Sequence, residues 1–342
     1  MPLLDGSANT IVHKLRWLAP SAAAISYPFW LDGFHIAVSP ASVPVSMIRI
    51  IGAALCLLAA MAMPLFGLAS AFRMTRADPS CFEMRALRLA YLSIGVPPFF
   101  VLIGVALGLL HLHVSDELVW VVGWLAACVY VLLGSESVPG SVARPPTRLR
   151  VAHGIAAALV VSFVLFHLTN HLLGLVGSDV HAAVMKVGRR VYRSPVVEPV
   201  LIALLLFQVV SGARLAWRWS SLPADAYRVF QIGSGAYLAA FILAHLNSAL
   251  ISARTVHKID TGWAWASGAP TGLIHDAWNI RRLPHYAFGV FFILAHLSSG
   301  LRGVVITHGV AAAVANRVWA VALVVSGLIS VAVISGLCGA RI

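Results

Sequence analysis

Long apolar segments, separated by short polar ones, occupy most of the chain. A helix of about 20 apolar residues crosses the hydrocarbon core of a bilayer, and segments of this kind recur eight times after residue 47. Their approximate ranges are 48–72, 89–110, 118–134, 155–176, 198–219, 227–251, 285–306 and 318–337. This pattern predicts an all-α integral membrane protein with about eight transmembrane helices.

The first 47 residues break the pattern with tryptophan, proline and acidic residues, among them Trp17, Pro28, Trp30 and Asp32. They also lack the basic start, short apolar run and cleavage site of a signal peptide. Tryptophan is frequent where a chain lies at a membrane surface, and proline punctuates helices. We therefore expect residues 1–47 to be an interfacial or re-entrant segment of the mature chain.

One phrase, Phe-x-Leu-x-His-Leu-x-(Asn/Ser), occurs three times inside apolar segments, around His167, His245 and His296. A degenerate fourth copy has Gln208 in place of the histidine. An ionisable ring in hydrocarbon is costly, so it normally faces the interior of a bundle. Neutral imidazole is also a common ligand of haem iron. The repeats predict a histidine-bearing, up-down four-helix bundle that binds haem.

Polar chemistry divides the remaining chain into two regions. Residues 48–150 hold three spans with almost no intramembrane polar groups, and they end in a basic, proline-containing linker. Residues 151–342 hold five spans and every copy of the histidine phrase. We expect a three-helix membrane region followed by a five-helix, haem-binding-type region. The connector at 252–284 mixes aromatic and polar residues, so it is either a lid or a substrate-binding loop.

Composition supports a membrane location. Hydrophobic residues make up 60% of the 342 and charged residues 11%, and the mean hydropathy is +0.90. The net charge of +12 does not indicate nucleic acid, because the basic residues lie in loops, where they report topology and contact with anionic lipid. Of the two sets of loops that carry basic residues, the one at 73–88, 135–150, 212–228 and 302–317 has the shorter loops, and basic residues in short loops favour the cytoplasmic side. We therefore place both termini outside the cytoplasm of a bacterial-type inner (cytoplasmic) membrane.

The four cysteines are scattered, and no Cys-x-x-Cys-His or zinc-type spacing occurs. This pattern excludes covalently attached c-type haem and favours small side chains packed in the membrane.

Depth along the helices sorts the polar residues into two pairs. In an up-down bundle, the spans 155–176 and 227–251 lie diagonally, as do 198–219 and 285–306. Counted from the outer ends, His171 is five residues in and His245 six, whereas Gln208 is about ten and His296 about eleven. At 1.5 Å per residue, each pair is nearly level. We predict bis-histidine haem ligation by His171 and His245, and a polar pair of Gln208 with His296.

His167 and His171 are one helical turn apart and share a face. One of them ligates iron in this interpretation, while the other contacts a propionate or a quinone oxygen. The alternative is that both bind one non-haem metal. One haem is expected; a second could use His153 and His308, although water-exposed helix ends explain these two residues as well.

The last of these histidine segments carries glycines beside its histidines. His285, Gly289, His296, Gly300 and Gly303 fall on one helical stripe. Two explanations remain open for this stripe: room for a flat porphyrin, or close contact between helices.

The sequence His296-Leu-Ser-Ser-Gly300-Leu-Arg302 resembles the His-x-x-x-Gly-x-Arg motif of the succinate dehydrogenase/fumarate reductase cytochrome b membrane anchors. The resemblance covers residues 151–342 and implies haem b at His296 and contact with quinone, with Arg302 as part of the site. The chain departs from that pattern at Gln208, after Arg302, and in its three additional N-terminal spans.

Three classes of function remain open. The first is a b-type cytochrome-like protein that transfers electrons between a quinone pool and a partner redox protein. The second is a membrane metalloenzyme, with His167 and His171 plus His245 or His296 as metal ligands. The third is a transporter or scaffold with intramembrane histidines. Because no flavin or nucleotide fingerprint is present, any dehydrogenase chemistry requires a soluble partner subunit.

Overall fold

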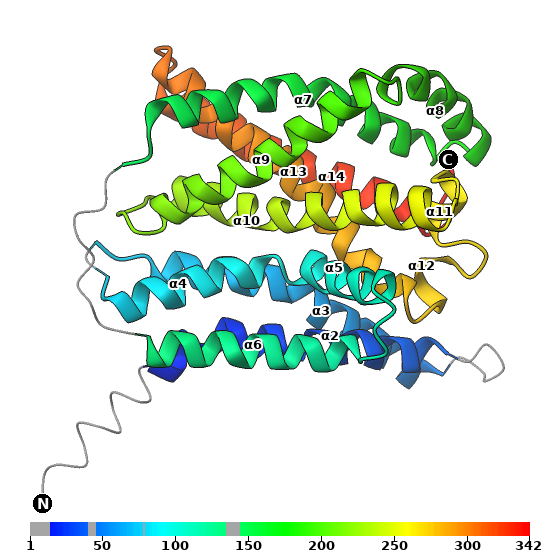
Figure 1. The fold of residues 1–342 in the computed structure, drawn as a ribbon, viewed down its shortest axis with the longest axis horizontal. Coiled ribbons are helices and arrows are strands. Elements are labelled where there is room, and N and C mark those ends of the chain that lie inside the picture. Colours follow the sequence, from blue (N-terminus) through cyan, green and yellow to red (C-terminus); the bar gives the residue numbers. More distant parts are fainter. Residues whose placement is uncertain (1–13, 40–45, 78, 135–143) are drawn as a thin grey trace, which may run out of the picture.

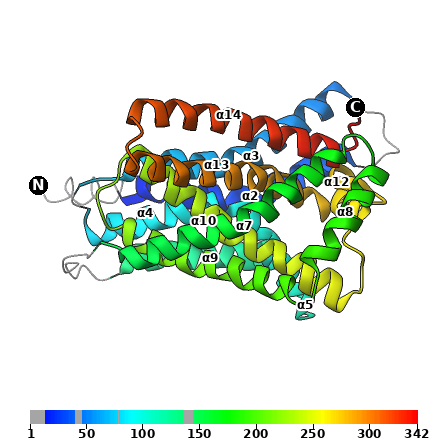
Figure 2. The same cartoon turned by 90° about the horizontal axis from the view of Figure 1, so that it is seen from above.

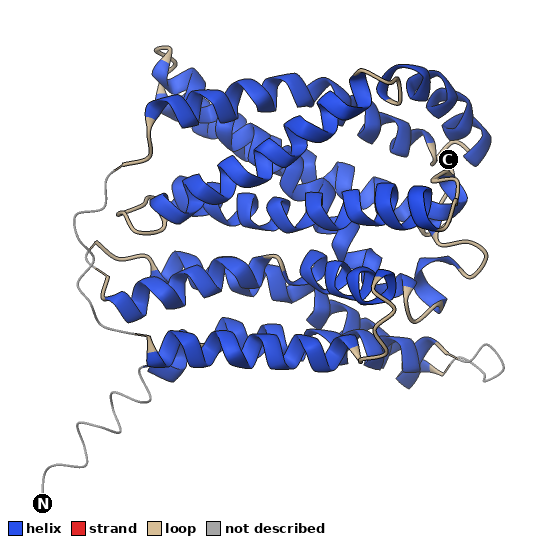
Figure 3. Cartoon of the chain, viewed as in Figure 1, coloured by secondary structure: helices blue, strands red, loops and turns tan. Residues whose placement is uncertain are grey.

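The structure is a computed structural model that describes the chain except for residues 1–13, 40–45, 78 and 135–143. The described residues form helices joined by short loops, without a β-strand among them (Figure 3). This architecture follows from the sequence, since every backbone group in hydrocarbon must be paired within the chain and a helix pairs them locally.

Seven helical stretches are long and apolar enough to cross a membrane. They are α3 (Met47–Met74), α6 (Asp116–Leu133), α7 (Thr147–Leu173), α9 (Val197–Trp219), α10 (Ala226–Leu246) continued by the π-helix η1 (Asn247–Val256), the 3-10 turn η2 (Asn279–Arg281) continued by α13 (Arg282–Thr307), and α14 (Ala312–Leu337). An eighth span is formed if α4 (Cys81–Ile94) and α5 (Val96–Leu109), which bend by 72° at Gly95, are counted together. The prediction of an all-α, multi-pass membrane protein is confirmed.

Four shorter or less apolar helices complete the described chain. They are α2 (Ala19–Val38), α8 (Ser178–Tyr192), α11 (Trp263–Ser267) and α12 (Gly272–His275). The helix α2 lies within the segment expected to be interfacial or re-entrant. Its 20 residues pack against α3, α4 and α6, and it runs alongside α6 in Figure 1.

The helices form two groups with α10 between them. The first group, α2 to α6, lies on one side, and α7, α9, α13 and α14 lie on the other (Figure 1). Seen from above in Figure 2, the second group overlies the first. Helix α10 packs against α9 and α13 and also against α3, α4 and α5. Gly233 makes this approach close, because a Cβ atom there would lie 2.8 Å from Ile94 Cδ1 and 2.9 Å from Leu68 Cδ1. The two regions predicted from the sequence therefore share one packed interface.

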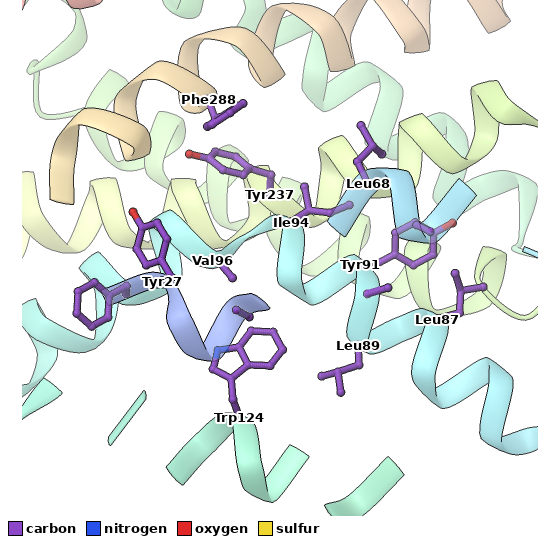
Figure 4. Packing of buried hydrophobic residues seen from close by; sticks show 14 of the residues in the cluster. Tyr27, Leu68, Leu87, Leu89, Tyr91, Ile94, Val96, Trp124, Tyr237 and Phe288 are labelled. Atoms are coloured by element: carbon purple, nitrogen blue, oxygen red, sulfur yellow. The ribbon is translucent and has the colours of Figure 1, made fainter. Parts of the chain in front are cut away.

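Large aromatic side chains fill the interior of the first group (Figure 4). Tyr27 is fully buried and contacts Phe100 and Trp120 with ring centroids 5.9 and 6.3 Å apart. The indole of Trp120 donates to the carbonyl of Ala24 at 2.8 Å. This core extends onto α10 through Tyr237, whose hydroxyl donates to the carbonyl of His285 at 2.7 Å. One face of α10 is thus fixed by packing, which sets the direction of its other face.

A buried ion pair also joins the two groups. Arg281 of η2 pairs with Asp116 of α6, and its guanidinium lies over the rings of Phe100 and Trp278. Both charged side chains are at most 16% exposed. Removing one partner would leave the other charge buried and unpaired, which is strongly destabilising.

Candidate functional site

A cavity lies between α7, α8, α9, α10 and α13, and it contains two of the three histidine phrases. His167 and His171 reach it from α7, His181 from α8 and His245 from α10. The rest of the wall is largely apolar, with Leu201, Leu205, Phe241, Ile242, Val290 and Ile293 among its lining residues. It is a mostly apolar pocket with a few convergent polar groups, the composition typical of a ligand site.

The repeated phrase orients its histidine through the phenylalanine four residues earlier. Residues at i and i+4 are neighbours on one helix face. Phe163 stacks on His167 with a centroid distance of 5.5 Å and an interplanar angle of 20°, and Phe241 stacks on His245 at 5.6 Å and 12°. In both copies the imidazole is held against its own helix.

His167 and His245 face one another from diagonal helices. Helix α7 packs on α9 and α14, while α10 packs on α9 and α13. The two imidazole centroids are 6.0 Å apart, and the ring planes differ by 69°. Within the described part of the chain, neither ring has a hydrogen-bond partner. Two imidazoles therefore converge on one space without satisfying each other.

His171 belongs to a different set of contacts. Its ring lies 4.7 Å from His167, 5.5 Å from His181 and 6.3 Å from Trp263, centroid to centroid. The Nδ1 atoms of His171 and His181 are buried without a hydrogen-bond partner among the described residues. A Cβ at Gly174 would lie 1.9 Å from Trp263, so this glycine lets the indole close over His171.

His181 is a cavity residue that sequence reasoning missed, because it lies in a connector rather than in a predicted span. Burial, and then the charge of Arg189, lower the pKa of His181, so the ring is neutral near pH 7. The sequence does carry a signal for it. In the segment 178–192, apolar residues recur at helical spacing and basic residues occupy another face, as expected of an amphipathic helix.

The sequence predicted His171 as the partner of His245, whereas the α7 imidazole whose ring lies 6.0 Å from that of His245 is His167. The helix ends differ from those drawn on the apolar pattern: α7 ends at Leu173 rather than 176, and α10 continues through η1 to Val256 rather than 251. Both differences place His245 deeper in the membrane, relative to the outer end of α7, than the count from the sequence did. His245 is therefore nearer in depth to His167, which lies farther from that end than His171.

Arginines line the rim of the cavity where α8, α9 and η1 meet. Arg254 forms a two-point contact with the carboxylate of Glu198. Burial, followed by the nearby cations of Arg189 and Arg254, lowers the pKa of Arg193. Arg189 pairs with Asp260 at 2.9 Å, and its Nε and Nη2 atoms are buried without a partner in the described structure. Of these groups, Arg193, Arg254 and Glu198 line the cavity, so the rim carries a net positive charge.

Gln208, His296 and Arg302, the other predicted site residues, lie outside this cavity. Gln208 donates to the carbonyl of His153 at 2.8 Å. His296 contacts two residues of α10, Gln231 at 3.1 Å and Ser234 at 2.9 Å. The expected polar pair of Gln208 with His296 does not form, because each residue is satisfied by a nearer partner on an adjacent helix.

Arg302 and Gly289 also have partners that the sequence did not indicate. The guanidinium of Arg302 lies 3.4 Å from the centroid of Tyr227 and donates to Asn316 at 2.7 Å. The ring of Phe241 fills the space beside Gly289, where a Cβ would lie 2.3 Å from it. At Gly289, close side-chain packing rather than a flat ligand explains the glycine.

No three His, Cys, Asp or Glu side chains among the described residues are arranged to hold a metal ion by themselves. Protein-only metal sites usually need three or four such ligands. The facing pair of His167 and His245 matches the different requirement of a metal whose remaining ligands come from a cofactor.

Comparison of the chain with protein-family models, with curated proteins and with solved structures found no match.

Proposed function

We propose that the protein is a membrane-embedded b-type cytochrome that transfers electrons between a lipid-soluble carrier of the quinone class and a partner redox protein. The proposal rests mainly on His167 and His245, which face one another across an otherwise apolar cavity. The unpaired state of both rings and the lack of a three-residue metal cluster in the described structure favour haem over a non-haem metal.

The distance between the two rings fits axial ligation. Two imidazoles on one iron, each with its nitrogen about 2 Å from the metal, have ring centroids about 6 Å apart. His167 and His245 have centroids 6.0 Å apart. His167 and His245 would thus hold the haem iron from diagonal helices, and the stacked Phe163 and Phe241 restrict the rotation of their rings.

The other residues of the cavity suit the remainder of a haem. Its flat apolar body would lie among aliphatic side chains of α9 and α10, and the arginine rim would pair with its acidic side groups, most directly through Arg193. Haem supplies one-electron chemistry when bound. The chain contributes ligands, a low-dielectric wall and positive charge, and these features set the reduction potential of a bound haem.

Quinone is the proposed carrier because apolar residues of α9 and η1 line the cavity beside polar groups. His171 and His181 present buried ring nitrogens without partners, and imidazole nitrogens can bind a quinone oxygen. Electrons then pass to or from a soluble redox subunit. The basic loops favour a bacterial-type cytoplasmic membrane with both termini outside the cytoplasm.

The test is an optical spectrum of the protein purified from a host with sufficient haem. We expect a Soret band and a reduced α-band that acid acetone extracts, and partial reduction by a short-chain quinol. The exposed His308, at the end of α13, provides a control: His308→Ala should keep the spectrum. A colourless wild-type protein would rule out the cytochrome.

A further inference from the structure

Helices α9 and α10 carry the same short motif, Gln-x-x-Ser-Gly-Ala. In α9 it begins at Gln208 and contains Ser211; in α10 it begins at Gln231 and contains Ser234. The two serines are each eight residues from the loop at 220–225 that joins the helices, or about 12 Å along each axis. Because α9 and α10 pack against each other, the two copies lie at the same depth.

The copy in α9 holds His153 of α7. The Nδ1 atom of His153 lies 2.7 Å from Ser211 Oγ, and this hydroxyl donates to the carbonyl of Phe207 at 2.5 Å. A hydroxyl has one proton, which is used on the carbonyl, so the serine accepts from His153 Nδ1–H. The Nε2 atom of His153 then keeps its lone pair, and it has no hydrogen-bond partner among the described residues.

The copy in α10 holds His296 of α13 in the same way. His296 Nδ1 lies 2.9 Å from Ser234 Oγ, and the hydroxyl donates to the carbonyl of Phe230 at 2.8 Å. The lone pair of Nε2 accepts from the side-chain amide of Gln231 at 3.1 Å. The Oε1 atom of that amide is buried without a partner in the described structure.

Glycines bring both rings close to the helices that hold them. A Cβ at Gly212 would lie 3.3 Å from His153 Cε1, and a Cβ at Gly235 would lie 3.1 Å from His296 Cε1. Each glycine directly follows the serine that fixes its ring. Helices α7 and α13 are also in contact, so the two imidazoles lie on neighbouring helices.

We propose that His153 and His296 form a second haem-ligand pair, with Nε2 of each imidazole as the axial ligand. A metal-bound histidine almost always donates its other ring N–H to an oxygen, which fixes the tautomer. Ser211 and Ser234 do this for the two rings, and ligation requires Gln231 to turn away from His296. The pair differs from the alternative of His153 with His308, since His308 Nδ1 lies 2.9 Å from the carbonyl of Val304 within its own helix.

The two imidazoles suit haem better than a bare ion. Haem needs only axial ligands from the protein, whereas an ion held by protein alone needs three or four. Ser234 is eleven residues from His245 on α10, about 16 Å, and His153 is fourteen residues from His167 on α7, about 21 Å. A second haem at this level would lie toward the other membrane surface, so that electrons could cross the bilayer within one chain.

This inference rests on the proposed function and extends it from one haem to two. The number of haems per chain distinguishes a failure of the second site from a failure of the first. We expect two haems per purified wild-type chain, one in His296→Ala and one in His245→Ala. The haem that remains in each variant also shows that the variant is folded. If His296→Ala holds as much haem as the wild type, the second site is wrong while the first stands. If wild-type protein holds none, both fail.

Replacing a serine tests the site without removing a ligand. Ser234→Ala should weaken binding of the second haem about 10- to 100-fold, the usual effect of losing such a hydrogen bond, and leave the first haem unchanged. Ser330→Ala is the matched control, because Ser330 also donates to a helix carbonyl, that of Ala287 at 2.6 Å, without contacting a histidine. Equal haem retention in the two serine variants at limiting haem would contradict the proposed role of Ser234.

Discussion

At the scale of the residue, surroundings decide what each histidine can do. The same phrase occurs three times, yet only His167 and His245 line the cavity, while His296 is hydrogen-bonded to Gln231 and Ser234. The sequence identifies these histidines as polar groups in apolar helices, which is a local property. Their partners depend on how the helices are rotated and shifted, which the apolar pattern of each segment does not indicate.

Ligand variants on α7 distinguish the two neighbouring histidines. His167→Ala should lose the haem held with His245, because the structure places no other α7 imidazole within 6 Å of that ring, centroid to centroid. His171→Ala should retain this haem and change its reactivity with quinol. Haem content after purification measures both. Loss of this haem in His171→Ala with retention in His167→Ala would restore the pairing predicted from the sequence.

The buried His181 makes stability depend on pH. Its pKa is lowered in the folded protein by burial and by Arg189, whereas the unfolded value is about 6.5. The unfolded chain therefore binds the proton more tightly, and stability falls as the pH drops below about 6.5. His181→Asn should lose less thermal stability than the wild type between pH 7.5 and 5.5. Identical losses in the two proteins would remove His181 as the cause.

At the scale of the element, helix existence was predictable and helix ends were not. An apolar run of about 20 residues specifies a span by itself, which is why the spans were found. The α4–α5 bend falls at Gly95-Val-Pro-Pro98, a local helix-breaking sequence inside an apolar run, whereas the apolar pattern does not mark the continuation of α10 as the π-helix η1. A shift of a few residues at such ends places His167 rather than His171 opposite His245, although both line the cavity.

Helix α13 supports the histidine of α10 through a glycine. In Gly289→Ala the new Cβ would lie 2.3 Å from the ring of Phe241, which stacks on His245. Overpacking of this kind costs about 1–3 kcal/mol. We expect a lower thermal midpoint and weaker haem binding.

Gly303→Ala on the same helix is the control, since a Cβ there meets no atom within 4 Å. Equal thermal midpoints and haem affinities for the two glycine variants would show that the Phe241–His245 stack does not depend on Gly289.

At the scale of the whole molecule, α10 belongs to both groups of helices. One face packs against α3, α4 and α5, and an adjacent face carries His245 into the cavity. The N-terminal group, which has little polar chemistry of its own, thereby helps to orient the site. The sequence suggested two regions, but composition could not reveal that they share this helix.

The ion pair of Asp116 with Arg281 should contribute strongly to this assembly. Asp116→Asn leaves the guanidinium buried without its charge partner, at an expected cost of about 3–5 kcal/mol. Asp260→Asn is the control, because Asp260 is 72% exposed and exposed pairs contribute about 0–1 kcal/mol. Thermal unfolding in one detergent measures both. A midpoint for Asp116→Asn as high as that of Asp260→Asn would show that the buried pair does not stabilise the assembly.

Ligation of haem by two imidazoles from different helices is the central claim, and electron paramagnetic resonance of the oxidised protein tests it most directly. Two axial nitrogen ligands make ferric haem six-coordinate and low-spin. We predict an exclusively low-spin signal for the wild type, and again for the one haem that remains in His245→Ala. A high-spin, five-coordinate signal in the wild-type protein would contradict the account.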